Sequence, residues 1–195
     1  MMTTQLGFYF DQRHCVGCCT CQIACKDQND LDVGQLFRRV REYAGGEFRQ
    51  AGKAVSPDVY AFWLSLGCNH CQDPLCVANC PTGAMQKRAL DGIVFVDQDV
   101  CIGCRYCVMS CPYGAPQYNP DKGKTGKCDM CRSRLVEGQS PACVAACPQR
   151  VIDFGPIDEL RKKYGTVAQV HGMPSPDRTH PSVVITPHRD ATSRI

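Results

Sequence analysis

The sequence predicts an α+β fold that is rich in loops and contains two similar units, one inserted within the other. Two observations carry this prediction. The chain has 17 cysteines among 195 residues, a density that points to cross-links or bound metal rather than to an ordinary apolar core. Elsewhere, short apolar segments alternate with turns that contain glycine or proline. The longest apolar stretch, Val59–Leu66, is far shorter than the about 20 residues that cross a bilayer, so no membrane span is expected.

Sixteen of the cysteines fall into four groups of four. The spacings within the groups are x2-x2-x3, x2-x4-x3, x2-x2-x3 and x2-x11-x3, and proline follows the final cysteine of the last three groups. Cys19 alone is left over. The four groups are Cys15, Cys18, Cys21, Cys25; Cys68, Cys71, Cys76, Cys80; Cys101, Cys104, Cys107, Cys111; and Cys128, Cys131, Cys143, Cys147.

This spacing is typical of the bacterial ferredoxin run C-x2-C-x2-C-x3-C-P, which binds [4Fe–4S] clusters through cysteine thiolates. Three cysteines two residues apart can surround one corner of a cluster, and Gly17 or Gly103 lets the backbone pass close to it. The fourth cysteine, near the start of a helix, points to a second cluster and ligates that one instead. Each group is therefore completed by another, and four groups predict four [4Fe–4S] clusters.

The order of the groups predicts which of them complete each other. Groups two and three are joined by Pro81–Val100, which has the pattern of a hairpin with its turn at Asp91-Gly92. They form one ferredoxin-like unit over 58–120, and groups one and four form the other from 1–57 and 121–160, followed by a C-terminal extension, 161–195. The predicted ligand sets are Cys15, Cys18, Cys21 with Cys147; Cys68, Cys71, Cys76 with Cys111; Cys101, Cys104, Cys107 with Cys80; and Cys128, Cys131, Cys143 with Cys25.

Other roles for the cysteines and histidines are less consistent with the spacing. Structural zinc usually uses isolated C-x2-C pairs, so a zinc-stabilised interaction protein is the distant alternative. Disulfides are disfavoured because the first residues, MMTTQLGFYFDQRH, show no secretory leader. Cys19 is expected to be an inert small apolar residue, with a substitute ligand as the alternative. His70 and His14 are expected to be hydrogen-bond donors or surface residues, because every group already has four cysteines.

No catalytic residue is predicted, because the chain has no G-x-S-x-G, P-loop or HExxH motif. The formal net charge of +3 and the basic run Arg38–Arg41 raise the possibility of nucleic-acid binding. An oxidised cluster with four thiolates carries a charge of about −2, however, so bound clusters would reverse the sign. We expect the basic residues to offset cluster charge or to form docking contacts, and we predict no nucleic-acid partner.

The regular elements are expected to be short. A Gly/Pro-bearing connector, Gly45–Pro57, separates two of the strands, and the chain from Val170 onwards is expected to be an extended tail that lies on a partner or frays. The expected strands are Gly7–Asp11, Phe37–Ala44, Asp58–Leu66 and Val151–Phe154, and the expected helices are Met130–Glu137, Pro141–Cys147 and Pro156–Lys163.

Four long segments carry a resemblance to a known family. They read FRRVREYAGGEF, CNHCQDPLCVANCPTGAM, VDQDVCIGCRYCVMSCPYGAPQYNP and CVAACPQRVIDFGPIDELRKKYG. With the order of the four cysteine groups, they resemble the iron–sulfur subunits of anaerobic dimethyl sulfoxide reductases, within the wider family of four-cluster, ferredoxin-type subunits of molybdopterin oxidoreductases. Some relatives have a non-cysteine residue and a [3Fe–4S] cluster where this chain has Cys104, so the resemblance implies four [4Fe–4S] clusters here.

The resemblance also implies a function. The chain would be a non-catalytic electron-transfer subunit that connects a quinol-oxidising membrane anchor subunit with a molybdopterin catalytic subunit that reduces dimethyl sulfoxide or a related S- or N-oxide. It would be membrane-associated through these partners, on the periplasmic face after co-export, with its clusters assembled in the cytoplasm. The alternative is the equivalent subunit of a tetrathionate, polysulfide, selenate or arsenate enzyme, because the substrate pocket lies on another chain.

Overall fold

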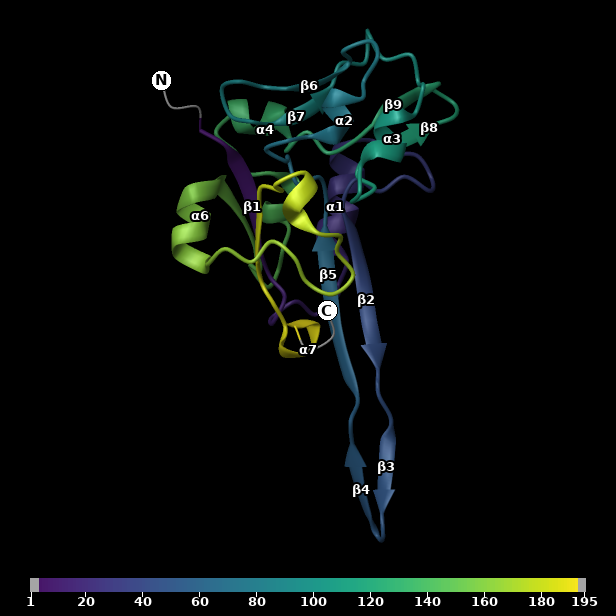
Figure 1. Ribbon diagram of the computed structural model, residues 1–195, viewed down its shortest axis with the longest axis vertical. Helices are drawn as coiled ribbons and strands as arrows, with labels where there is room; N and C mark the ends of the chain where they lie inside the picture. Colours follow the sequence, from purple (N-terminus) through teal and green to yellow (C-terminus); the bar gives the residue numbers. More distant parts are fainter. Residues whose placement is uncertain (1–3, 193–195) are drawn as a thin grey trace.

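Small sheets and short helices surround the cysteine loops in the computed structural model, which describes residues 4–192 (Figure 1). The predicted α+β, loop-rich class is confirmed. Residues 1–3 and 193–195 lie outside the described residues. They belong to the expected unit of 1–57 with 121–160 and to the expected C-terminal extension, 161–195.

A three-stranded sheet joins the two ends of the chain. Its central strand β1 (Leu6–Asp11) is antiparallel to β10 (Ile152–Pro156) and parallel to β11 (Val183–Thr186). Side chains of β1 alternate between two faces, so Phe8 and Phe10 enter the main core while Tyr9 packs under helix α6 (Ile157–Tyr164). The predicted strands and helix in these regions are confirmed.

The C-terminal segment contradicts the expectation of an extended or fraying tail. It contains a short 3-10 helix, η1 (Pro176–Arg178), the strand β11 and the helix α7 (Arg189–Thr192). Residues 183–185 of β11 are buried. The tail prediction was wrong because the β-branched run VVIT fits the free edge of β1, where it gains backbone pairing and apolar burial together.

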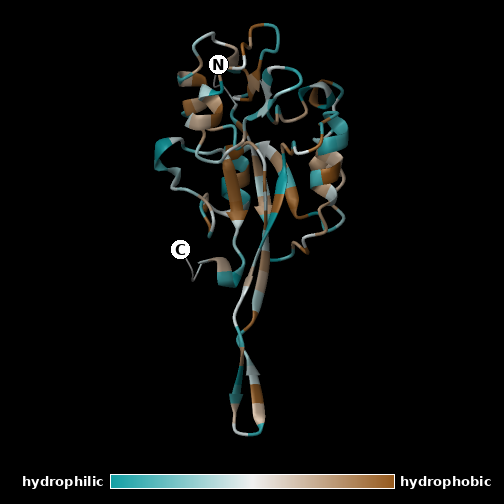
Figure 2. Ribbon diagram, turned by 90° about the vertical axis from the view of Figure 1, so that its right-hand side faces the viewer, coloured by the Kyte–Doolittle hydropathy of each residue, from teal (hydrophilic) through white to brown (hydrophobic). Residues whose placement is uncertain are grey.

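A long two-stranded arm projects from the body (Figures 1 and 2). Strands β2 (Arg39–Gly45) and β5 (Tyr60–Leu66) form its base. The expected connector is instead a second hairpin, β3 (Phe48–Ala51) with β4 (Ala54–Pro57), whose residues are all exposed. Gly46 separates the two hairpins with a φ of 89°, and a Cβ there would overlap the carbonyl of Asp58, so only glycine fits the position.

Five short helices carry or follow the cysteine loops: α1 (Thr20–Gln28), α2 (Leu75–Ala78), α3 (Tyr106–Ser110), α4 (Arg132–Val136) and α5 (Ala142–Ala145). Helix α1 packs against α5, and α2 packs against α3. The hairpin predicted at Asp91-Gly92 is confirmed as β6 (Met85–Lys87) with β7 (Val94–Val96). A further hairpin, β8 (Gln117–Asn119) with β9 (Lys124–Gly126), was not expected.

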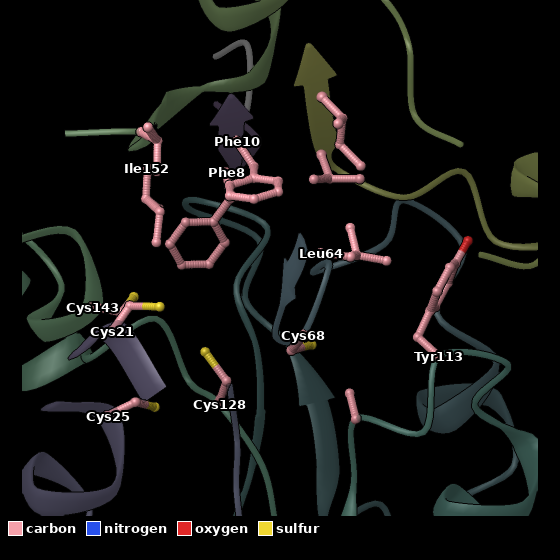
Figure 3. Packing of buried hydrophobic residues seen from close by; sticks show 14 of the residues in the cluster. Phe8, Phe10, Cys21, Cys25, Leu64, Cys68, Tyr113, Cys128, Cys143 and Ile152 are labelled. Carbon is pink, nitrogen blue, oxygen red and sulfur yellow. The ribbon is translucent and has the colours of Figure 1, made fainter. Parts of the chain in front are cut away.

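Cysteine side chains form part of the main core. Figure 3 shows Cys21, Cys25, Cys128 and Cys143 around a common space beside Phe8. Since the same core includes strands from both ends of the chain, the cysteine loops and the apolar core form one packed structure.

Candidate metal centres

The structure gathers the cysteines in the combinations that the spacing predicts, and each combination is called a set here, numbered by the group that supplies three members. Set 1 consists of Cys15, Cys18, Cys21 and Cys147, which line one hollow together with Cys19. Helix α1 supplies Cys21, and Cys147 follows α5. Gly17 has a φ of 67°, and a Cβ there would overlap the indole of Trp63. The loop is therefore held between the hollow and the base of the arm.

Set 3 has the same arrangement as set 1. Cys80, Cys101, Cys104 and Cys107 line a second hollow. Gly103 has a φ of 68°, and a Cβ there would overlap the carbonyl of Gly123. From the sequence, glycine is expected in both loops because the backbone passes close to a cluster there. In the structure, neighbouring protein groups also leave no room for a side chain at Gly17 or Gly103.

Set 2 lies deeper in the protein. Cys68, Cys71, Cys76 and Cys111 line a third hollow, with Lys127 at its wall. Burial, reinforced by the charge of Cys68, raises the pKa of Cys71 and Cys76 to about 12. These thiols would therefore stay protonated near neutral pH unless a metal replaced the proton.

Set 4 joins helix α1 to the last cysteine group. Burial, then the charges of Cys143 and Cys131, raise the pKa of Cys25 to about 12. Burial, then the charges of Cys25 and Cys68, raise the pKa of Cys128 well above its usual value. Cys25, Cys128 and Cys143 lie in one buried cluster, around the space that Figure 3 shows, and the charge of Cys131 acts on Cys25. His70 lies between Cys68 of set 2 and Cys128 of set 4.

Hydrogen-bond donors point at several of these sulfurs. Backbone N–H groups donate to Cys68, Cys80 and Cys128, from His70, Met85 and Met130 at 3.5, 3.3 and 3.4 Å. A thiolate that accepts such bonds is stabilised, so the donor set fits a group bound through cysteine sulfur. Within residues 4–192, no three histidine, cysteine or acidic side chains lie close enough to hold a single metal ion. Four cysteine sulfurs form a donor set that fits an iron–sulfur cluster, and their role as ligands stays a prediction.

Two basic residues, Arg38 and Lys127, are buried beside the sets. Arg38 donates from Nη1 to the carbonyl and Oγ of Ser65, at 3.2 and 3.1 Å, and Ser65 Oγ lies 3.3 Å from Cys21 Sγ. Burial would lower the pKa of Arg38, but the charges of Cys143 and Cys21 outweigh it and raise this pKa. No acidic residue among those that the structure describes pairs with Arg38, and Cys143 and Cys21 are the groups whose negative charge would act on it most strongly.

His70 is fully buried, so the surface interpretation was wrong, whereas the hydrogen-bond role is confirmed. Its Nδ1 accepts the backbone N–H of Val94 at 3.0 Å, and its Nε2 faces Cys128 Sγ at 3.8 Å. Burial, then the charges of Lys127 and Arg38, lower the pKa of the imidazole well below its usual value. No sequence pattern indicates this contact, apart from the position of His70 between two ligand candidates.

Cys19 has a local structural role. It precedes helix α1 with a φ of 60°, and Arg105 precedes α3 with a φ of 65°, so the two residues occupy equivalent loop positions. The Cys19 thiol donates to the carbonyl of Gly17 at 3.3 Å. His14 lies at the surface, where its Nδ1 is 3.0 Å from Asp11.

Comparison with known proteins places this arrangement in a defined class. Residues 59–157 match the family model of the 4Fe-4S dicluster domain. The class of protein that the fold and the cysteine sets define is therefore an iron–sulfur protein with ferredoxin-like cluster loops.

Curated relatives narrow this class. One chain of the anaerobic dimethyl sulfoxide reductase of Escherichia coli (strain K12) is 54% identical over 97% of the present sequence and 92% of the relative. The chain of the same name from Haemophilus influenzae is 53% identical over 96% of the present sequence and 91% of the relative. A thiosulfate reductase electron transfer subunit of Salmonella typhi is 40% identical over 81% of the present sequence and 79% of the relative.

These identities, which extend over nearly the whole sequence, define the family. The protein belongs to the iron–sulfur electron-transfer subunits of the anaerobic dimethyl sulfoxide reductase type. Between residues 4 and 192, no helix combines the length and apolar character needed to span a membrane.

Proposed function

We propose that the chain holds four [4Fe–4S] clusters and relays electrons from a quinol-oxidising membrane anchor subunit to a molybdopterin catalytic subunit that reduces dimethyl sulfoxide or a related S- or N-oxide. Bound [4Fe–4S] clusters supply one-electron oxidation and reduction. The observation that carries the proposal is the gathering of sixteen cysteines into four sets that follow one another through the protein.

The order of the sets supports a relay. Sets 1 and 4 adjoin because helix α1 contributes Cys21 to one and Cys25 to the other. Sets 4 and 2 adjoin at His70, which lies against Cys128 Sγ and Cys68 Sγ. Sets 2 and 3 adjoin because helix α2 contains Cys76 of set 2, and Cys80 of set 3 lies just after the end of this helix. The order is therefore 1, 4, 2, 3.

Exposure also distinguishes the ends of this series from its middle. Cys18 in set 1 and Cys104 in set 3 are exposed, whereas most cysteines of sets 2 and 4 are buried. Electrons would enter and leave at the two ends, where partner proteins can approach, and the protein would keep water from the two inner sets.

The proposal includes two ferredoxin-like units, 58–120 and the outer segments 1–57 with 121–160, followed by the extension 161–195. Helix α2 packs on α3 within the unit 58–120, and α1 packs on α5 within the unit formed by the outer segments. Both contacts support this division. Each helix pair presents cysteines to two neighbouring sets, which is how two-cluster ferredoxin units share their fourth ligands.

The names of the relatives favour dimethyl sulfoxide as the oxidant. Identity is 54% to the dimethyl sulfoxide reductase relative and 40% to the thiosulfate reductase relative. The equivalent subunit of an enzyme for another oxidised sulfur, selenium or arsenic compound is the second candidate. We propose that partner subunits hold the protein at the periplasmic face of the membrane. Reoxidation of the dithionite-reduced complex by dimethyl sulfoxide, but not by thiosulfate, would support the first candidate, and the reverse would support the second.

The first test is the content of iron, zinc and acid-labile sulfide in anaerobically purified protein. Four clusters require about sixteen irons and sixteen sulfides per chain, with little zinc. About four zinc ions without sulfide would overturn the proposal and leave a zinc-stabilised protein.

A further inference from the structure

We propose that His70 is the positioning residue that couples the two ferredoxin-like units, because its two N–H groups hold one sulfur of set 2 and one of set 4. The inference rests on the proposed function. The backbone N–H of His70 donates to Cys68 Sγ at 3.5 Å. The imidazole Nε2 lies 3.8 Å from Cys128 Sγ. One residue thus spans the junction between the two inner sets.

The hydrogen bonds of the ring decide its tautomer. Val94 donates its backbone N–H to Nδ1 at 3.0 Å, so Nδ1 carries a lone pair and no proton. A neutral imidazole then has its proton on Nε2. That N–H is directed at Cys128 Sγ, and protonation of Nδ1 would place two N–H groups against each other. The geometry therefore keeps the ring as a donor to set 4.

The surroundings fix the ring in this position. His70 has no exposed surface, and Phe8 packs beside it with ring centroids 6.2 Å apart. Lys127 is also buried, and its Nζ donates to the carbonyls of Val94 and Cys128. The same lysine therefore braces both the strand that orients the imidazole and the loop that carries the sulfur.

Two consequences follow for an electron that crosses between the units. A hydrogen bond to a ligand sulfur favours the more negative, reduced state and raises the reduction potential of the cluster bound there. The path from Cys68 Sγ through the His70 residue to Cys128 Sγ also contains only covalent and hydrogen bonds. His70 would thus raise the potential of the set 4 cluster and shorten the route into it from set 2.

The test compares His70→Leu with His70→Gln in the complete complex. Leucine removes the side-chain donor, whereas the amide Nε2 of glutamine can occupy the place of the imidazole Nε2. Both variants keep the backbone donor and place a non-glycine residue at the φ of 42°. We expect unchanged iron and sulfide, a lower midpoint potential for one cluster in His70→Leu by redox titration with EPR detection, and recovery towards the native potential in His70→Gln. Full iron with unchanged potentials in His70→Leu would overturn the inference.

A measurement on the unsubstituted protein covers the case in which a variant loses its clusters. With 15N in the imidazole ring of histidine, pulsed EPR of the reduced complex should detect a ring-nitrogen coupling to one cluster. A His14→Gln control, which removes the histidine next to Cys15, should keep that coupling. If the clusters are present and no such coupling is found, the inference about His70 is wrong and the electron-transfer function stands. If iron and sulfide are absent, the proposed function itself fails.

Discussion

At the scale of single residues, neighbouring cysteines have different environments. Cys18 accepts a hydrogen bond from Thr20 Oγ1 at 3.4 Å, and the hydrogen bonds of Thr20 lower the pKa of the Cys18 thiol. The thiol of the adjacent Cys19 instead donates to the backbone. Set 3 places Cys104 and Arg105 in the corresponding positions. The first residue of each pair is a ligand candidate, whereas the second precedes a helix with a positive φ.

This contrast predicts the effect of single cysteine substitutions. Cys104→Ser should convert the set 3 cluster to [3Fe–4S], because the loss of one thiolate releases one iron, and the protein should lose about one iron per chain. EPR of the oxidised protein would show the new signal. Cys19→Ser is the matched control and should retain the native iron content. Four intact [4Fe–4S] clusters in Cys104→Ser would contradict the ligand assignment.

Arg38 provides a second prediction, because its charge is buried and no described acidic residue balances it. Arg38→Met should lower the free energy of unfolding of the cluster-bound protein by about 3–5 kcal/mol, the usual effect of removing one member of a buried charge pair. The apparent melting temperature, followed by the loss of visible cluster absorbance, should fall by roughly 10 °C.

The exposed Arg41 offers the control. Arg41→Met should change the melting temperature by no more than about 2 °C, as expected for a surface substitution. Equal melting temperatures for Arg38→Met and the native protein would mean that sets 1 and 4 do not depend on the buried guanidinium.

The spacing of the cysteine loops predicts four sets, whose role as cluster ligands stays a prediction. It did not predict the buried partners of those sets. His70 meets Cys128 only because strand β7 and the last cysteine loop lie side by side, and Arg38 meets Cys21 through Ser65 on strand β5. Such contacts arise from distant segments, and no local pattern encodes them.

At the scale of elements, β11 shows how tertiary pairing decides the structure of a segment. Its four residues, Val183–Thr186, are too few to form a stable strand alone. They pair in parallel with β1, and Val183, Val184 and Ile185 have exposed fractions of 3%, 0% and 1%. The C-terminal segment is therefore part of the core.

The burial of β11 predicts a large effect from a small substitution. Ile185→Ala should lower the free energy of unfolding by about 2–5 kcal/mol, because it removes apolar contacts and leaves a cavity. The apparent melting temperature should fall by at least about 5 °C. Val33, which is 99% exposed, provides the control, and Val33→Ala should be close to neutral. A small effect of Ile185→Ala would indicate that the tail packs loosely.

The elements that sequence predicted had strong local signals. The turn Asp91-Gly92 between alternating apolar residues identified the β6–β7 hairpin, and Pro156 identified the start of α6. The two unexpected hairpins lack such signals. The tip of the arm has no apolar face that is buried, and β8 and β9 read QYN and KTG, so no alternation of apolar and polar residues could reveal them.

At the scale of the whole molecule, the cysteines take the place of much of an ordinary core. Six of them, Cys21, Cys25, Cys68, Cys128, Cys143 and Cys147, belong to the largest apolar cluster of buried residues. Bound clusters would then link segments that have few apolar side chains between them. Metal binding and folding are coupled in such proteins.

Removal of the iron should therefore unfold the body of the protein. Treatment with an iron chelator under oxidising conditions should abolish near-UV circular dichroism and expose the protein to limited proteolysis. The arm provides an internal control, because its tip is exposed already and should be cleaved before and after treatment. Retention of the native near-UV spectrum after complete loss of iron would show that the apolar core folds alone.

The three-stranded sheet also determines when the molecule can be completed during its synthesis. Strand β1 leaves the ribosome well before its partners β10 and β11. Segments between β1 and β10 could fold on the nascent polypeptide, whereas the three-stranded sheet must wait until β10 and β11 have left the ribosome. Until then Phe8 and Phe10 of β1 have no sheet to cover them, so a chaperone that masks the N-terminal segment would protect the unfinished protein from aggregation.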